Sequence, residues 1–222
     1  MEKFKTIAVL CALFFAGLVG CSDQGKIVPT VPSMASGLSV GLDTVFSFPG
    51  DTVLLKITGG TPPFAFLGPP PSTAAQFFIS GSTMTIVGNS VGSTVAMIID
   101  ASSPVNRLDL PISVESAVSF TNSIQPIFTG QYGCVGCHGG TEGLFLTTAT
   151  VSYQNLVNVP AQSPGYAGYK RVDPRNLANS LLYIRLASND PSVSMPQGRT
   201  APFDPASLSN VRTWILQGAH FN

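Results

Sequence analysis

The chain has 222 residues, of which 44% are hydrophobic and 10% are charged, and its 11 basic and 11 acidic side chains balance. The chain lacks the excess of basic residues that is typical of nucleic-acid-binding proteins, so no nucleic-acid partner is expected. The length allows one or two domains with a sizeable core. The 22 glycines and 18 prolines favour a portion rich in strands and loops.

The N-terminus has the pattern of an export signal. Lys3 and Lys5 precede an apolar run over residues 6–17, which is too short to span a bilayer permanently. Residues 18–21, Leu-Val-Gly-Cys, resemble the lipobox of bacterial lipoproteins. The resemblance implies a signal peptide over residues 1–20 and a lipid anchor on Cys21.

The alternative is an ordinary signal peptide that happens to be followed by a cysteine. Lipidation accounts better for Cys21, because an unpaired thiol is unusual in an oxidising compartment. Ser22 follows the cysteine where aspartate would indicate the inner membrane, which favours the outer membrane. Residues 21–36 are expected to form a flexible tether.

The next segment alternates with period two. Val53, Leu55 and Ile57 form one such run, and similar runs cover residues 95–99 and 108–114, with turn residues between them. This pattern predicts a β-sandwich over residues 37–116. Residues 57–64 resemble the strand and turn of bacterial immunoglobulin-like domains.

Helical periodicity begins near residue 117. Apolar side chains recur at helical spacing over residues 120–128, and a second helix is expected from Asn176 to Ser188. Asp204 is predicted to be the N-cap of a last helix, with Pro205 in its first turn.

The sequence Cys134-Val135-Gly136-Cys137-His138 has CxxCH spacing. Two thiols so placed can bind the vinyl groups of one haem, and His138 can then ligate the iron. Zinc normally needs a second pair of ligands, and beyond this motif the chain offers only Cys11, Cys21 and His220. A redox-active CxxC is typical of a βαβ setting, which this segment does not resemble.

Several further residues extend the motif into a family resemblance. Residues 117–222 resemble the single-haem c-type cytochrome domain of bacterial envelope proteins, as judged from CxxCH, Met195-Pro196, and the Trp-Ile and Gly-Ala pairs near the C-terminus. The resemblance implies two domains, an all-β immunoglobulin-like sandwich followed by a mainly α cytochrome c-like domain. It also implies one covalently bound haem c.

Met195 precedes proline in a loop, and the resemblance implies that it is the second axial ligand of the iron. His220 is the other imidazole and stands two residues from the C-terminus, where a surface position is more common. Arg171 and Arg185 could each neutralise a haem propionate or be solvated.

These features predict a membrane-anchored monohaem carrier of single electrons in the bacterial cell envelope, rather than an enzyme. Its partners would be redox proteins of the envelope and the membrane that holds its lipid. One alternative is a haem enzyme or sensor with an open iron site for peroxide or a gas. Another is a binding module that docks a partner through the sandwich.

Overall fold

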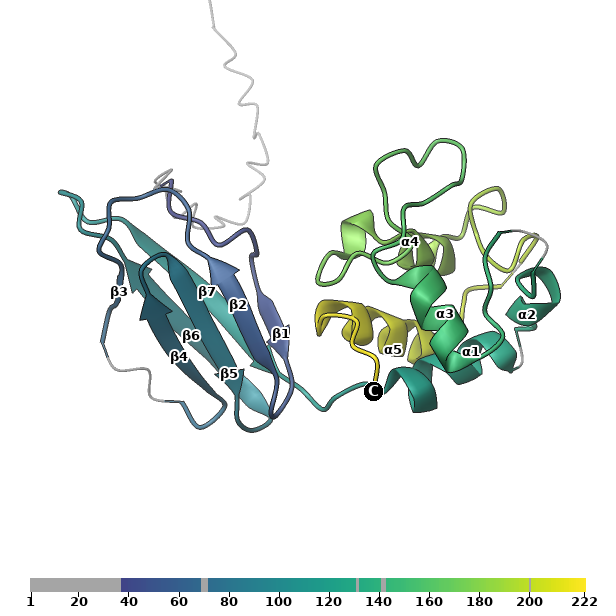
Figure 1. The fold of residues 1–222 in the computed structure, drawn as a ribbon, viewed down its shortest axis with the longest axis horizontal. Helices are drawn as coiled ribbons and strands as arrows, with labels where there is room; N and C mark the ends of the chain where they lie inside the picture. Colours follow the sequence, from purple (N-terminus) through teal and green to yellow (C-terminus); the bar gives the residue numbers. More distant parts are fainter. Residues whose placement is uncertain (1–36, 69–71, 131, 141–142, 200) are drawn as a thin grey trace, which may run out of the picture. The chain divides into compact units, whose positions relative to one another are not determined.

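The computed structural model describes residues 37–68, 72–130, 132–140, 143–199 and 201–222 (Figure 1). The predicted signal peptide 1–20, the predicted lipidation site Cys21 and the predicted tether 21–36 lie outside these residues. The described residues all belong to one compact unit. None of their helices is both long and apolar enough to cross a membrane.

The described part of the first half contains two sheets (Figure 1). One has the order β1-β7-β6-β3 and the other the order β2-β5-β4. All pairs are antiparallel except β1 with β7. The strands are β1 Val45–Ser47, β2 Thr52–Lys56, β3 Ala65–Phe66, β4 Ala75–Ser80, β5 Thr83–Gly88, β6 Gly92–Ile99 and β7 Arg107–Val114.

The alternation predicted from the sequence determines which side chains face inward. Val53, Leu55 and Ile57 are buried, as are Met84 and Ile86 of β5. The intervening residues of β2 are exposed. One core cluster joins buried residues from both sheets, which is how paired sheets bury their inner faces.

Pro111 lies within β7, a strand with neighbours on both sides. Proline cannot donate a backbone hydrogen bond and is normally confined to edges. The parallel partner β1 pairs only with Ile112 to Val114, so β7 has no named strand beside Pro111 on that side. The short β1 therefore explains how the proline is tolerated.

The second half of the chain, residues 117–222, contains short helices separated by loops. They are η1 Phe120–Ile124, which is a π-helix, α1 Gln125–Thr129, α2 Cys134–Cys137, α3 Ala149–Leu156, η2 Leu177–Asn179, which is a 3₁₀ turn, α4 Leu181–Ala187 and α5 Pro205–Leu216. The predicted start of α5 is confirmed. The Asp204 side chain accepts a hydrogen bond from the Ser207 amide at 2.7 Å, and this bond holds the pKa of Asp204 below its usual value.

The helix expected from Asn176 to Ser188 is broken in two. The Asn176 side chain accepts from the Asn179 amide at 3.2 Å, which caps only the 3₁₀ turn η2. The Ser180 hydroxyl donates to the carbonyls of Asp173 and Asn176 and accepts from the Asp173 amide. These local bonds hold Ser180 in an extended conformation, so α4 begins only at Leu181.

The predicted fold class is wrong. About 25% of the structure is helical and about 26% is extended, so the fold is mixed and rich in sheet, not a β-domain followed by a mainly α cytochrome c-like one. The longest helix, α5, has 12 residues, and most of the second half is loop and turn. Contacts also cross the predicted boundary at residue 117. Arg175 Nη1 donates to the Phe46 carbonyl at 2.6 Å, and its Nη2 lies 3.2 Å from Oδ2 of Asp51.

Candidate functional site

The CxxCH segment forms the short helix α2. Gly133 precedes it with a φ of +58°, a conformation that favours glycine. The His138 amide then donates to the Cys134 carbonyl at 2.7 Å, which places the imidazole directly after the helical turn. Cys134 is partly buried and Cys137 is exposed. Burial raises the pKa of the Cys134 thiol.

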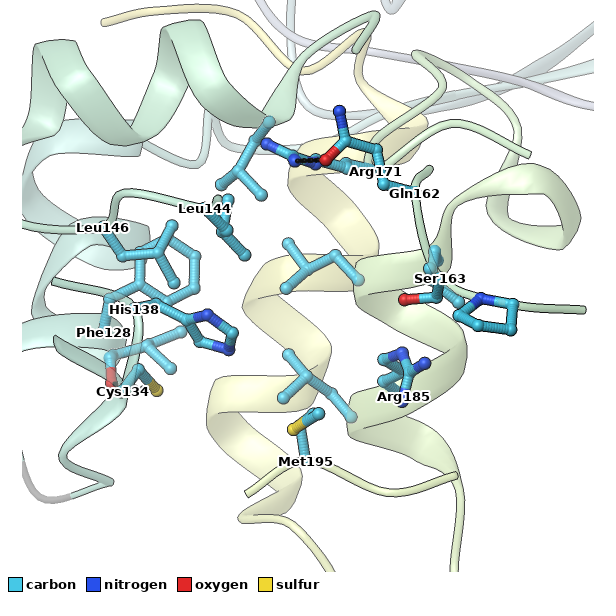
Figure 2. A pocket seen from close by; sticks show the side chains of 16 residues that line it. Phe128, Cys134, His138, Leu144, Leu146, Gln162, Ser163, Arg171, Arg185 and Met195 are labelled. Atoms are coloured by element: carbon cyan, nitrogen blue, oxygen red, sulfur yellow. Dashed lines mark hydrogen bonds between the residues drawn. The ribbon is translucent and has the colours of Figure 1, made fainter. Parts of the chain in front are cut away.

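A cavity of about 380 Å³ lies beside this segment (Figure 2). Such a volume is within the usual range of small-molecule and cofactor pockets. Its lining is mainly apolar and is drawn from several segments of the second half. The lining residues are Ile127, Phe128, Cys134, His138, Leu144, Leu146, Leu156, Gln162, Ser163, Pro164, Arg171, Leu181, Leu182, Arg185, Leu186 and Met195.

His138 and Met195 reach the cavity from different elements. Figure 2 shows the imidazole and the thioether both directed into the space between the apolar walls, with Cys134 near the imidazole. His138 follows α2, and Met195 lies in the loop between α4 and α5. The cavity thus combines a nitrogen ligand and a soft sulfur ligand, the pair that characterises one class of haem iron site.

Arg171 is held at the edge of the cavity by neutral acceptors. Its Nη1 donates to the Asn155 carbonyl at 3.0 Å, and its Nη2 donates to the Gly143 carbonyl at 2.9 Å and to Gln162 Oε1 at 3.4 Å. Burial lowers the pKa of Arg171. None of the ion pairs found among the described residues includes Arg171, so no carboxylate offsets its charge there.

Arg185 brings a second cation to the same cavity. Its Nη1 donates to the Val193 carbonyl at 3.0 Å, and its guanidinium lies 5.3 Å from the centre of the Tyr166 ring. It too takes part in none of the ion pairs of the described chain. The cavity therefore has two cationic groups whose partners are carbonyls and a ring, an arrangement suited to an anionic ligand.

The structure brings together five of the six residues predicted to bind the cofactor. Cys134, His138, Met195, Arg171 and Arg185 line the cavity. Cys137 does not line it but lies at the end of the same short helix. His220, the alternative axial ligand, lies elsewhere: its ring centroid is 5.5 Å from that of Phe48, and its Nε2 is 3.7 Å from Oδ1 of Asp51.

One wall of the cavity could not be predicted from the sequence. Gln162, Ser163 and Pro164 belong to a loop whose ends are closed by isolated bridges between Pro160 and Lys170 and between Val157 and Val172. This loop has no hydrophobic period, and its closure depends on pairing between residues that are 10 and 15 positions apart in the chain. No local pattern could have identified it.

Metal ions bound by protein side chains alone are a separate question. Within the described ranges no three or more His, Cys, Asp or Glu side chains form a group that could hold a metal ion. The two thiols and the imidazole of CxxCH are therefore not gathered into such a group in the described structure.

Comparisons with known proteins add little. No family model matches the chain, and no curated protein matches it. Among solved structures, domains 4 and 5 of the S-layer protein SbsC match with 20% identity and a TM-score of 0.30, over 36% of this chain and 51% of theirs. A Bacteroides fragilis protein named "putative alpha-galactosidase" matches with 11% identity and a TM-score of 0.27, over 38% of this chain and 20% of its own. The chain thus spans about half or less of these structures, and the likeness is too low to identify a family.

Proposed function

We propose that the chain is a carrier of single electrons that holds one covalently bound haem c in the bacterial cell envelope. The observation that carries the proposal is the pairing of His138 and Met195 in one apolar cavity beside the CxxCH helix (Figure 2). The spacing of the motif and the character of the cavity are independent features that favour the same group.

The residues present fit a haem. Cys134 and Cys137 would each form a thioether, and their separation by two residues suits the two vinyl groups on one porphyrin. Leu144, Leu146 and Leu156, from the loop and helix that follow the motif, would exclude water from the ring. When bound, the haem would supply a one-electron iron couple, and the protein would tune it.

The chain's own ligands would set the character of that couple. His138 would donate a ring nitrogen and Met195 a thioether, which raises the reduction potential relative to two imidazoles. Because His138 and Met195 would both be committed to the iron, the site would be suited to electron transfer and not to binding a substrate. Arg171 and Arg185 would offset the charge of the haem's two carboxylates without losing their carbonyl partners.

Two parts of the proposal concern the envelope. The lipobox-like sequence that ends at Cys21 supports a lipid anchor, since two or more acyl chains bind stably to a membrane. Ser22 favours the outer membrane. The partners would then be the membrane and redox proteins of the envelope.

The test uses the full chain expressed together with a haem-maturation system. We expect haem to remain attached after denaturation and acid-acetone extraction, and the ferric protein to show the low-spin spectrum of His and Met ligation. The chain has two histidines, so His220→Ala is the matched control for His138→Ala. His220→Ala should keep the low-spin spectrum, and His138→Ala should lose it.

A second pair of variants examines the sulfur ligand. Met195→Ala should abolish the weak far-red sulfur-to-iron band and open the iron to added ligands, whereas Met97→Ala in β6 should not. A protein that binds zinc without haem would contradict the proposal. A high-spin haem in the unaltered protein would instead favour an enzyme or sensor with an open iron site.

A further inference from the structure

The loop that carries Met195 connects α4 to α5 and is hydrogen-bonded both to α4 and within itself. The Met195 amide donates to the Arg185 carbonyl at 3.0 Å. The amides of Val193 and Ser194 donate to the Asp190 carbonyl at 3.0 and 2.8 Å. The position of the Met195 backbone therefore depends on where the end of α4 lies.

Arg185 connects to the same loop twice. Its backbone carbonyl accepts from Met195, and its side chain donates to the Val193 carbonyl at 3.0 Å. Its side chain also contributes to the cavity, so it cannot be changed without altering the cavity itself. It is thus unsuitable for separating the position of the loop from the chemistry of the site.

Arg199 makes the other attachment and does not line the cavity. Its Nη2 donates to the Leu186 carbonyl at 3.0 Å and to the Ser188 carbonyl at 2.6 Å. These carbonyls are at the C-terminal end of α4, where helices leave acceptors unsatisfied and favour a cation. The guanidinium also lies 5.4 Å from the centre of the Phe203 ring, just before α5.

We propose that Arg199 is a positioning residue for Met195: it joins the end of the loop to the end of α4 and so holds the thioether toward His138. The inference rests on the proposed function, because the position of the sulfur matters only if it is a ligand. Arg199 follows Met195 in the chain, and its side chain bonds to the carbonyls of Leu186 and Ser188, which precede Met195. These bonds hold the two ends of the loop at a fixed separation.

A structural detail separates this role from a contribution to stability. Nη1 of Arg199 is buried and has no hydrogen-bond partner in the described structure. Arg199→Met removes this unsatisfied donor, which offsets part of the cost of leaving the Leu186 and Ser188 carbonyls without the guanidinium. We therefore expect the loop to loosen beyond what the fall in the unfolding midpoint accounts for.

The experiment compares the full-length protein with Arg199→Met, Arg199→Lys and a control, Arg107→Met. Arg107 is exposed at the start of β7 and pairs with Asp109, so its replacement removes a guanidinium far along the chain from the loop. Three quantities are measured: the midpoint of denaturant unfolding, the amide exchange of residues 190–199, and the concentration of imidazole that displaces the thioether from ferric iron.

We expect Arg199→Met to speed exchange of the Met195 amide and to lower the displacing imidazole concentration by about tenfold, the effect of losing hydrogen bonds from a charged donor. The lysine variant should recover part of both effects, since it keeps a cationic donor. Arg107→Met should change neither the exchange of the Met195 amide nor the displacing imidazole concentration.

The two proposals can fail separately. Unchanged exchange and unchanged displacement in Arg199→Met would overturn the positioning role, as would an equal change in Arg107→Met. The positioning role would also be overturned if amide exchange and imidazole displacement in Arg199→Met changed only as much as the lowered unfolding midpoint explains. If the unaltered protein shows no sulfur-to-iron band, the proposed function fails, while the exchange measurement still reports whether Arg199 holds the loop.

Discussion

Trp214 is the side chain whose replacement should best measure how the second half is held together. It lies on α5 and is only 1% exposed. Its ring centroid is 5.0 Å from that of Phe120 on η1, and its Nε1 donates to the His220 carbonyl at 2.9 Å. It therefore joins the first helix, the last helix and the C-terminal segment.

Trp214→Phe should destabilise the protein by about 2 kcal/mol. The lost hydrogen bond accounts for about 1 kcal/mol. The smaller ring buries roughly 40 Å² less apolar area, within the spread of aromatic side chains, which at 25 cal/mol/Å² adds about 1 kcal/mol. For a chain of this size the melting temperature should fall by about 4–8 °C.

Far-UV circular dichroism in denaturant is the suitable assay, because Trp214 is the only tryptophan and its fluorescence is lost in the variant. The reduction potential should not change, since the indole does not line the cavity. An unchanged unfolding midpoint would refute the reasoning. A normal midpoint with slowed electron transfer would show that Trp214 relays electrons instead of packing.

Three other predictions follow from the sequence and the structure. Cys21→Ser should convert a protein that partitions into detergent into a soluble periplasmic product, and recovery of the unaltered protein in the soluble fraction would count against lipidation. A fragment of residues 117–222 should keep the haem spectrum, because every residue that lines the cavity lies between Ile127 and Met195; its failure to do so would show that residues before 117 are needed. Asp173 is held below its usual pKa: burial opposes the shift, and hydrogen bonds from Lys170 and Asn179 outweigh it. The ionised carboxylate therefore stabilises the fold above the unfolded pKa of about 3.9, and this contribution is lost as pH falls through the folded pKa. Asp173→Asn should cost about 1 kcal/mol at pH 7 and progressively less below pH 4, and a cost independent of pH would contradict this.

The parts of the fold that could be predicted depend on local patterns. The inward positions of β2 follow from strict alternation, and the start of α5 follows from Asp204 and Pro205. Each of these features is decided by residues within a few positions of one another. The break at Ser180 was missed because the serine hydroxyl bonds to the Asp173 and Asn176 carbonyls, and either a helix or a break is compatible with the sequence there.

The error in fold class has a different origin. The cysteine motif and the helical spacing indicate a mainly α domain, whereas most of the second half is loop and turn joined by long-range bonds. Isolated bridges such as Val157 with Val172 have no periodicity that could be recognised. The sheet-side partner of Arg175, the Phe46 carbonyl, is 129 residues away.

The candidate site shows the same division between what a sequence reveals and what it does not. Cys134, His138 and Met195 stand out because few residue types ligate iron, and the chain contains only two histidines and five methionines. The groups that hold them are mostly backbone carbonyls, such as the Arg185 carbonyl that accepts from Met195 and the two that accept from Arg199. Every residue has a carbonyl, so no residue type identifies the ones that matter. The chemistry of such a site can therefore be proposed from the sequence, but the precision with which the thioether is held depends on contacts that only the folded chain defines.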